Sequence, residues 1–420
     1  MVTPASTNRR RQFVSKLNRK ISDFSLMKIR DTLYRNPITT SSIVICAIFF
    51  LRFLVGGFDP SYYIVVGEKK SVKDDFIHDL KTLKNGSGYD GQYFYRYAIN
   101  PFNKDLKYGN KYGRYGIKID TPIYRRGRLI YPLFAWVLAF GQEELIPYTL
   151  ILVNILAFIS LFVIFKEIVS IFKLPFYYLY IPFLIGGLYF SVARNLSDIL
   201  GCTIFAWCYL LFIKEKYSWF LFSSTLLLLC KETYVIFLAP AYLILFRNNF
   251  NKNSSFDRYI RNALLLLPWG VLISWKYLLT ILYPDITSAL PRKLGGDFDF
   301  PFKGMYDSMM MEFSIAQSIK GVYILWGILL ITVCLKGIFD KKLFQVNNWM
   351  YWLIWINVPL VTCFAKSIYI DMWGFMRILA PTYLCVFLFL IEEKIEIPRW
   401  LIGYSVLMVI SIVAIVVLVV

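Results

Sequence analysis

Apolar runs long enough to cross a lipid bilayer recur along this chain and constrain its fold more than any other feature. They lie near residues 41–58, 145–165, 174–193, 196–213, 262–283, 320–339, 347–365, 373–391 and 399–420. A helix of about 17–25 residues spans the hydrocarbon core, where the backbone must satisfy its own hydrogen bonds. Only 17% of the residues are charged, against about 25% in soluble domains. The sequence therefore predicts an all-α polytopic integral membrane protein.

Two further apolar stretches need a separate interpretation. Residues 217–246 are interrupted by Lys231 and Glu232, which predicts two short helices with a polar apex. Residues 129–141 are too few for a full crossing, and we interpret them as interfacial or re-entrant. The predicted cytoplasmic loops then carry thirteen Lys and Arg residues and the short external apices carry three, which agrees with the positive-inside rule. We expect about eleven transmembrane helices with the N-terminus cytoplasmic; counting 129–141 as a crossing gives twelve.

The rest of the chain divides into a tail and one membrane domain. Residues 1–40 form a basic tail, predicted to be cytoplasmic, and 41–420 form a single transmembrane domain. The net charge of +19 is spread between apolar runs, which indicates membrane lipids as partners and not nucleic acid. The seven cysteines lie inside apolar runs and His78 is the only histidine. We therefore expect buried free thiols that hold no metal, and no histidine-based zinc site.

Two loops predicted to be external are long. The first, residues 59–128, carries fourteen basic and eight acidic residues, and the second, 284–319, is rich in Pro, Gly and Asp. Residues 72–84 have the spacing of an amphipathic helix lying on the membrane surface. Residues 89–99 predict a second helix, which ends before Pro101. Long loops in compact proteins are usually functional, so we expect the site in the first loop.

Asp90 is the first candidate for chemistry. It stands where the second helix of the loop begins, with Tyr93, Phe94 and Tyr97 on one helical face. An acid beside aromatic rings is a common way to hold a sugar, because the rings cover its apolar faces and the carboxylate accepts a hydroxyl proton. The alternative is that Asp90 only caps the helix. The pair Asp74 and Asp75 is a rival acid, although it lies on the charged face of the predicted surface helix.

Three arginines form a second candidate. Arg125, Arg126 and Arg128 precede the apolar stretch 129–141 and are expected at the membrane edge. Guanidinium groups stay ionised and make paired hydrogen bonds to phosphate, so they suit the phosphate of a lipid-linked substrate. The alternative is anchoring to ordinary phospholipid headgroups.

Three polar breaks between the later helices fall on the side predicted to be external. Each break contains two ionisable residues close in sequence: Arg194 and Asp198, Lys231 and Glu232, and Asp371 and Arg377. Ionisable groups are costly near lipid unless they face water or one another. Together with Asp90 and the arginines they are predicted to ring one cavity. Alternatively, each is a structural ion pair or a snorkelling anchor.

Four short motifs carry a resemblance to a known family. They are Tyr-Asp-Gly-Gln-Tyr-Phe-Tyr at 89–95, Arg-Arg-Gly-Arg-Leu-Ile-Tyr-Pro at 125–132, Asn-Leu-Ser-Asp at 195–198 and Lys-Glu-Thr at 231–233. In these motifs, and in the order of helices and loops over most of its length, the chain resembles the GT-C superfamily of polytopic glycosyltransferases. Within that superfamily it is similar to bacterial membrane proteins of cell-surface glycopolymer formation, and more distantly to the GPI mannosyltransferases.

The resemblance implies an inverting transferase of the bacterial cytoplasmic membrane. It would move a sugar from a polyprenyl-phosphate donor to a lipid- or glycan-linked acceptor on the external face. Asp90 would be the general base, and Arg125, Arg126 and Arg128 would hold the donor phosphate, without a metal ion or any other cofactor. Many members have paired acids in the first loop, so Asp74 and Asp75 stay open as alternatives. The predicted substrate cavity comprises Tyr89, Gln92, Tyr93, Tyr97, Tyr131, Asp198, Lys231, Glu232, Asp371 and Arg377.

Two other functional classes remain as alternatives. A flippase or secondary transporter for lipid-linked glycans would be expected to show repeated halves and charges at mid-membrane, whereas this chain shows no internal repeat and its charges lie near helix ends. An accessory subunit of an envelope complex is compatible with the same residues. A polymerase or ligase of surface polysaccharide would be expected to carry its large loop late in the chain, so the early position of the long loop argues against that class.

Overall fold

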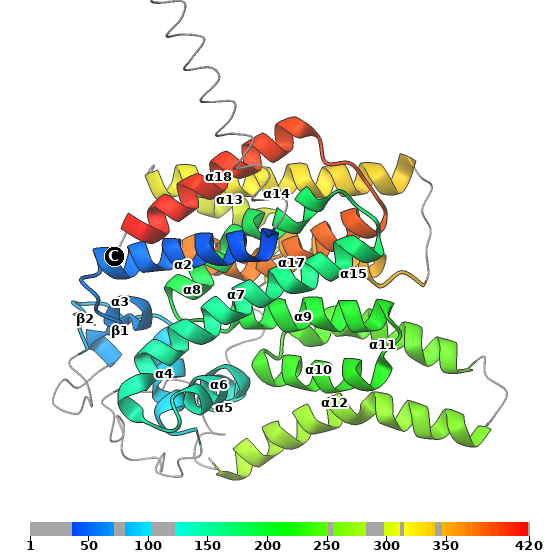
Figure 1. Ribbon diagram of the computed structural model, residues 1–420, viewed down its shortest axis with the longest axis horizontal. Helices are drawn as coiled ribbons and strands as arrows, with labels where there is room; N and C mark the ends of the chain where they lie inside the picture. The colour runs from blue at the N-terminus through cyan, green and yellow to red at the C-terminus, as the bar shows by residue number, and fades with distance from the viewer. Residues whose placement is uncertain are drawn as a thin grey trace, which may run out of the picture.

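The computed structural model describes residues 36–70, 80–101, 117, 122–250, 255–282, 298–310, 315–340, 347–370 and 372–418. Helices account for most of these residues, and the one sheet within them has two strands of two residues each. The long helices lie roughly along the horizontal axis of Figure 1, and the short helices α3–α6 gather at the left end of the bundle. The predicted all-α class is confirmed for this part of the chain.

Helices form at each of the predicted apolar runs. Six are long and apolar enough to cross a membrane: α2 (Pro37–Val55), α7 (Ile146–Ile171), α12 (Ser255–Leu282), α14 (Ile315–Asp340), α17 (Met372–Glu392) and α18 (Arg399–Leu418). Four apolar helices are shorter: α9 (Asp198–Ile213), α10 (Tyr217–Cys230), α11 (Tyr234–Phe250) and α15 (Trp349–Thr362). The run 174–193 is a bent pair, η4 (Phe176–Leu184) and α8 (Gly186–Ala193), with 54° between its halves.

The breaks predicted from polar residues are present. The stretch 217–246 divides into α10 and α11 at Lys231–Thr233. Helix α6 (Ile130–Leu138) occupies the short run 129–141, and its 9 residues cover only about 14 Å at 1.5 Å per residue. It packs on α4 (Gly91–Ile99) and α7. It is therefore too short to cross the roughly 30 Å hydrocarbon core.

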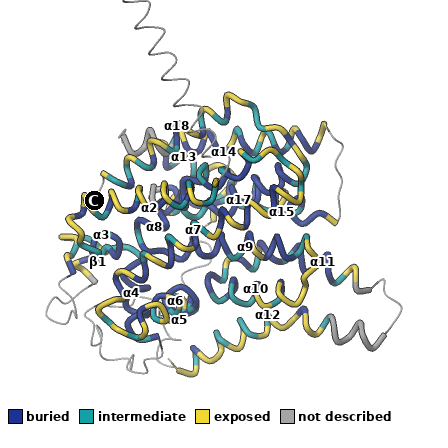
Figure 2. The backbone as a smooth tube through the Cα atoms, in the orientation of Figure 1, coloured by how far each residue is buried: buried dark blue, intermediate teal, exposed yellow. Residues whose placement is uncertain are grey.

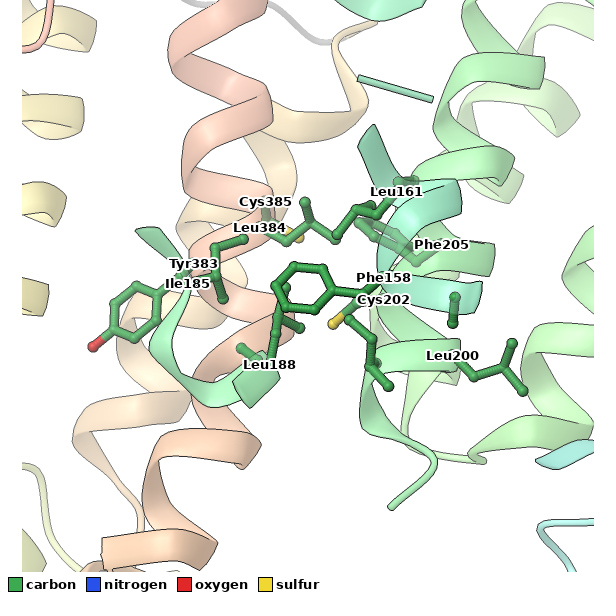
Figure 3. Close-up of a cluster of buried hydrophobic side chains, with 14 of the residues drawn as sticks. Phe158, Leu161, Ile185, Leu188, Leu200, Cys202, Phe205, Tyr383, Leu384 and Cys385 are labelled. Carbon is green, nitrogen blue, oxygen red and sulfur yellow. The ribbon is translucent and has the colours of Figure 1, made fainter. Parts of the chain in front are cut away.

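Burial places α17 at the centre of the bundle and α12 at its edge. Most of the apolar window of α17 is buried, whereas less than a third of that of α2, α12 or α18 is (Figure 2). In the core, Phe158 of α7 lies against Leu188, Cys202 and Cys385 (Figure 3).

The expectation of buried free thiols is confirmed for Cys202, Cys208, Cys230, Cys334 and Cys385, but it is wrong for Cys46, which is exposed on α2. A cysteine inside an apolar run can thus face outward when its helix lies at the rim.

The first loop differs from the prediction. The amphipathic helix expected over 72–84 is wrong for its last part, because Thr82–Leu83 forms strand β2 and pairs in parallel with β1 (Val66–Gly67). Residues 71–79 lie outside the described residues. A turn follows β2, in which Asn85 donates its backbone N–H to Glu68 Oε2 at 2.8 Å. Backbone pairing across the loop, which side-chain spacing does not encode, decides the structure here.

The second loop is also more ordered than its composition suggests. Within 284–319, residues Lys303–Met309 form helix α13 and α14 already begins at Ile315. Two backbone bonds attach the loop to the end of α15: Asp299 N–H donates to Cys363 at 2.8 Å and Phe302 N–H to Thr362 at 2.7 Å. Ser308 then donates to the carbonyl of Tyr369 in α16 (Lys366–Ile370) at 3.1 Å.

Arg52 in α2 is a fully buried cation that joins three helices. Its guanidinium donates to the carbonyls of Tyr62 at 2.9 Å and Ala193 at 3.2 Å, and also to that of Val416. The Tyr63 ring lies 5.0 Å from it. Because these carbonyls belong to the segment after α2 and to the ends of α8 and α18, Arg52 fixes the relative positions of three membrane helices.

We predict that Arg52→Met lowers the free energy of unfolding by about 2 kcal/mol, because buried carbonyls lose their donor. Thermal unfolding of the purified protein in detergent measures this. Cys46→Ser, at an exposed position of the same helix, should leave the unfolding temperature unchanged. An Arg52→Met protein as stable as the wild type would show that these bonds contribute nothing.

Candidate functional site

The local fold places Asp90 at the start of α4 and holds it firmly. Gln92 is fully buried, accepts from the N–H of Gly67 at 3.2 Å and donates to the carbonyl of Ser87 at 2.9 Å. A methyl group on Gly91 would collide with the backbone carbonyls of Arg194 and Ile64. Glycine at 91 thus lets α4 pack closely against the end of α8. Gln92, predicted to line a substrate cavity, instead fastens the loop.

Asp90 does not cap α4. Its side chain makes no capping hydrogen bond, so the capping interpretation is wrong. Arg125 donates to one carboxylate oxygen at 2.7 Å and Arg377 to the other at 2.8 Å. Burial would raise the pKa of Asp90, but the charges of Arg377, Arg125 and Arg128 outweigh it and hold the pKa well below its ordinary value. The carboxylate is therefore ionised and held between cations from two distant segments.

Arg377 links Asp90 to a second, deeper acid. Its other guanidinium nitrogen lies 3.6 Å from Asp198 at the start of α9. Asp198 is also ion-paired with Lys231, which follows α10, and both side chains are buried. Four segments of the chain thus meet at one end of the bundle through Asp90, Arg377, Asp198 and Lys231.

Arg128 and Glu232 add another ion pair beside this one. Arg128 Nη2 lies 3.4 Å from Glu232 Oε1 and also donates to the hydroxyl of Tyr124. Burial would raise the pKa of Glu232, but the charges of Arg128 and Lys276 outweigh it and lower that pKa. Glu232 keeps 21% of its side chain exposed, whereas Arg128 keeps 5%.

Arg126 has a different role from its two neighbours. Its guanidinium is buried and donates to the carbonyl of Pro101 at 2.7 Å. It lies beneath the ring of Tyr97, whose centroid is 5.7 Å away. Arg126 thus ties α5 (Pro122–Arg126) to the end of α4. This contact of Arg126 is structural, and the binding of one phosphate by all three arginines stays a prediction.

The predicted aromatic shelf is occupied by arginines. The ring of Tyr93 lies 4.3 Å from the Arg125 guanidinium and that of Tyr89 lies 5.1 Å from Arg377. Tyr93 and Tyr97 are buried, and Phe94 packs edge-on against Tyr131 at 5.1 Å. Tyr131 is itself fully buried and donates to the carbonyl of Leu150. In this state, Tyr93, Tyr97 and Tyr131 are therefore packing residues and only Tyr89 is partly open.

The structure brings most of the predicted charged residues together but changes their partners. Asp198 pairs with Lys231 and Arg377, and Glu232 pairs with Arg128. Lys231 and Glu232, which are neighbours in sequence, thus each have a partner from another segment. Asp371, Asp74 and Asp75 lie outside the described residues.

Lys276 of α12 is a member of this group that the sequence analysis missed. It is half-buried, and its charge acts on both Glu232 and Arg128. A single lysine inside the apolar run 262–283 was the available signal, because a lone ionisable residue in such a run indicates function.

Positive charge exceeds negative charge in the assembled site. The described members comprise five cations, Arg125, Arg128, Lys231, Lys276 and Arg377, and three carboxylates, Asp90, Asp198 and Glu232. In a partly desolvated place, two unmatched cations favour the binding of an anion. No three His, Cys, Asp or Glu side chains within the described ranges come close enough to hold a metal ion. The site is thus suited to a phosphate and contains two partly exposed acids, Asp90 and Glu232.

Comparison of the chain with protein-family models, with curated proteins and with solved structures gave no match.

Proposed function

We propose that the protein is a membrane glycosyltransferase that moves a sugar from a polyprenyl-phosphate donor to a lipid- or glycan-linked acceptor. The observation that supports it most is the position of Asp90, an ionised carboxylate at the end of a bundle of apolar helices, in contact with Arg125 and Arg377. A base for an acceptor hydroxyl and cations for a leaving phosphate are what this transfer requires.

The ion pairs of Asp90 suggest how the donor would prepare the site. Arg377 also approaches Asp198 at 3.6 Å, so it stays anchored if one of its partners moves. The side chain of Arg125 is 17% exposed. We propose that Arg125 leaves Asp90 and binds the donor phosphate instead. That exchange would leave one carboxylate oxygen of Asp90 free to accept a proton.

The proposed transfer is then a single displacement. The acceptor hydroxyl gives its proton to Asp90 while its oxygen bonds to the anomeric carbon of the sugar. The bond between that carbon and the phosphate oxygen breaks, and polyprenyl phosphate leaves with the negative charge. Arg125 and Arg128 stabilise this charge as it develops, which preorganised cations do best in a site with little water.

The proposed topology follows from the helices. The six long helices and the bent pair η4–α8 supply up to seven crossings, and we propose that the four shorter apolar helices cross as well, which makes eleven with α6 outside the count. The charged group from Asp90 to Lys276 then lies at one membrane face, proposed to be the external face of a bacterial cytoplasmic membrane. The basic residues of 1–40 would remain in the cytoplasm.

The direct test is transfer of radiolabelled sugar from a panel of synthetic polyprenyl-phosphate sugars by the purified protein in nanodiscs, with membrane extract as the source of acceptor. We expect labelled lipid or glycan product with at least one donor, and none from empty nanodiscs. Donor binding without transfer to any acceptor, in an assay that works with a known transferase, would contradict the proposal and favour a flippase or an accessory subunit.

A further inference from the structure

Lys276 extends the charged site to the lipid-facing edge of the bundle. Helix α12 forms that edge beside α10, and its last turns reach α5 (Figure 1). A methyl group on Gly127 would collide with Nζ and Cε of Lys276 and lie 3.1 Å from the carbonyl of Tyr124. The ammonium group of Lys276 therefore rests on the bare backbone of Gly127, between Arg126 and Arg128.

The charge of Lys276 is not matched by a direct partner. Within the residues that the structure describes, it makes no ion pair and no hydrogen bond, and the carboxylate that it influences, Glu232, is paired with Arg128. A half-buried ammonium group costs solvation free energy unless an anion compensates it. An anion that contacts Lys276 would also be close to Arg128, whose charge acts on Lys276.

The surface next to Lys276 is strongly apolar. Ile273, Tyr277 and Ile281 recur every four residues along α12 and are 67%, 66% and 57% exposed. Residues three and four apart share one helical face, and Lys276 lies at the border of this face. A ligand that satisfies both features has an anionic head on Lys276 and a hydrocarbon tail along α12.

We propose that Lys276, held against the backbone of Gly127, and Arg128 form a binding site for the phosphate of a polyprenyl phosphate, whose isoprenoid chain lies on the Ile273–Ile281 face of α12. The inference rests on the proposed function for the identity of the lipid, since the same molecule is the leaving group of the proposed transfer. It adds a residue and a tail path that the motifs near Arg125 do not indicate.

Binding of farnesyl phosphate tests this site without requiring catalysis. Native mass spectrometry of the full-length protein released from detergent would compare farnesyl phosphate, farnesol, inorganic phosphate and a phosphatidylglycerol. We expect a complex with farnesyl phosphate and at least tenfold weaker binding of the other three. Lys276→Met should weaken the complex about tenfold, the effect of one charge-assisted hydrogen bond, and Lys276→Arg should restore it.

Two further variants separate position from charge. Gly127→Ala keeps every charge but displaces the flexible end of Lys276, so it should weaken farnesyl phosphate binding without loss of thermal stability. Lys366→Met removes an exposed lysine outside the network and should have no effect. Equal affinity of the wild type and Lys276→Met would overturn the inference, and so would equal binding of phosphatidylglycerol, which would make this an ordinary lipid site.

The outcome also separates the two proposals. If the wild type transfers sugar and Lys276→Met does not change the binding of farnesyl phosphate, the transferase proposal stands. The proposed role of Lys276 is then wrong. Lys276-dependent binding of farnesyl phosphate without any sugar transfer would support the phosphate site and count against the transferase. A wild-type protein that binds no prenyl phosphate would contradict both.

Discussion

Asp90→Asn should reduce sugar transfer by about 10²- to 10⁴-fold, the usual contribution of a general base. Asparagine keeps the shape of the side chain but cannot accept the acceptor's proton. It also removes the charge that Arg125 and Arg377 contact at 2.7 and 2.8 Å, so more positive charge becomes available to the donor phosphate. We therefore expect kcat to fall while the affinity for farnesyl phosphate stays equal or rises.

The matched control is Asp59→Asn. Asp59 lies in the same loop, is ion-paired with Lys81 at 3.1 Å and has 18% of its side chain exposed, against 17% for Asp90. It belongs to no part of the charged site, so its variant should transfer sugar at the wild-type rate. Asp90→Asn with wild-type kcat, at equal protein level, would remove Asp90 as the base and return attention to Asp74 and Asp75.

The pH dependence gives a second readout for Asp90. Because its pKa lies below the ordinary value of about 3.9, the carboxylate should stay ionised at all pH values above the ordinary one. Its ion pairs should therefore contribute fully to stability from pH 8 down to pH 5, and that contribution should disappear only as pH falls through the lowered pKa. An acid limb in the transfer rate between pH 5 and 8 should accordingly come from another group.

The helices were largely predictable from the sequence because lipid imposes length and composition on each of them. The break at Lys231 and Glu232 and the short helix α6 were predictable for the same reason. Strand β2 was not, since the spacing of Leu80 and Leu83 fits a helix equally well. Its backbone pairs with Val66–Gly67, a contact across the loop that no local pattern specifies.

The members of the site were more predictable than their contacts. Polar residues at helix ends indicate function, and this rule found Asp90, Asp198, Glu232 and Arg377. The rule does not give their contacts: Arg377 contacts Asp90 across 287 positions and Arg128 contacts Glu232 across 104. The tyrosines were predicted to face a sugar because they share one helical face. Their spacing does not show that arginines from distant segments lie against them.

Asp198→Asn should produce the largest loss of stability in this site, about 3–5 kcal/mol, as for other broken buried ion pairs. The substitution leaves Lys231 buried without the carboxylate that it contacts. Lys231→Met should cost less, because Asp198 keeps Arg377 at 3.6 Å. Thermal unfolding in one detergent, at pH 7 and fixed protein concentration, measures both effects.

The double variant Asp198→Asn/Lys231→Met decides whether the pair stabilises the fold or serves the site. Removing both charges leaves no unpaired ion at Lys231, so most of the stability lost in Asp198→Asn should return. Lys214→Ala, which breaks an exposed ion pair with Glu167, is the control and should change little, as surface pairs do. A double variant as unstable as Asp198→Asn alone would show that the loss has another cause. Recovered stability with lowered sugar transfer would instead mean that the buried pair is kept to hold Arg377 against Asp90.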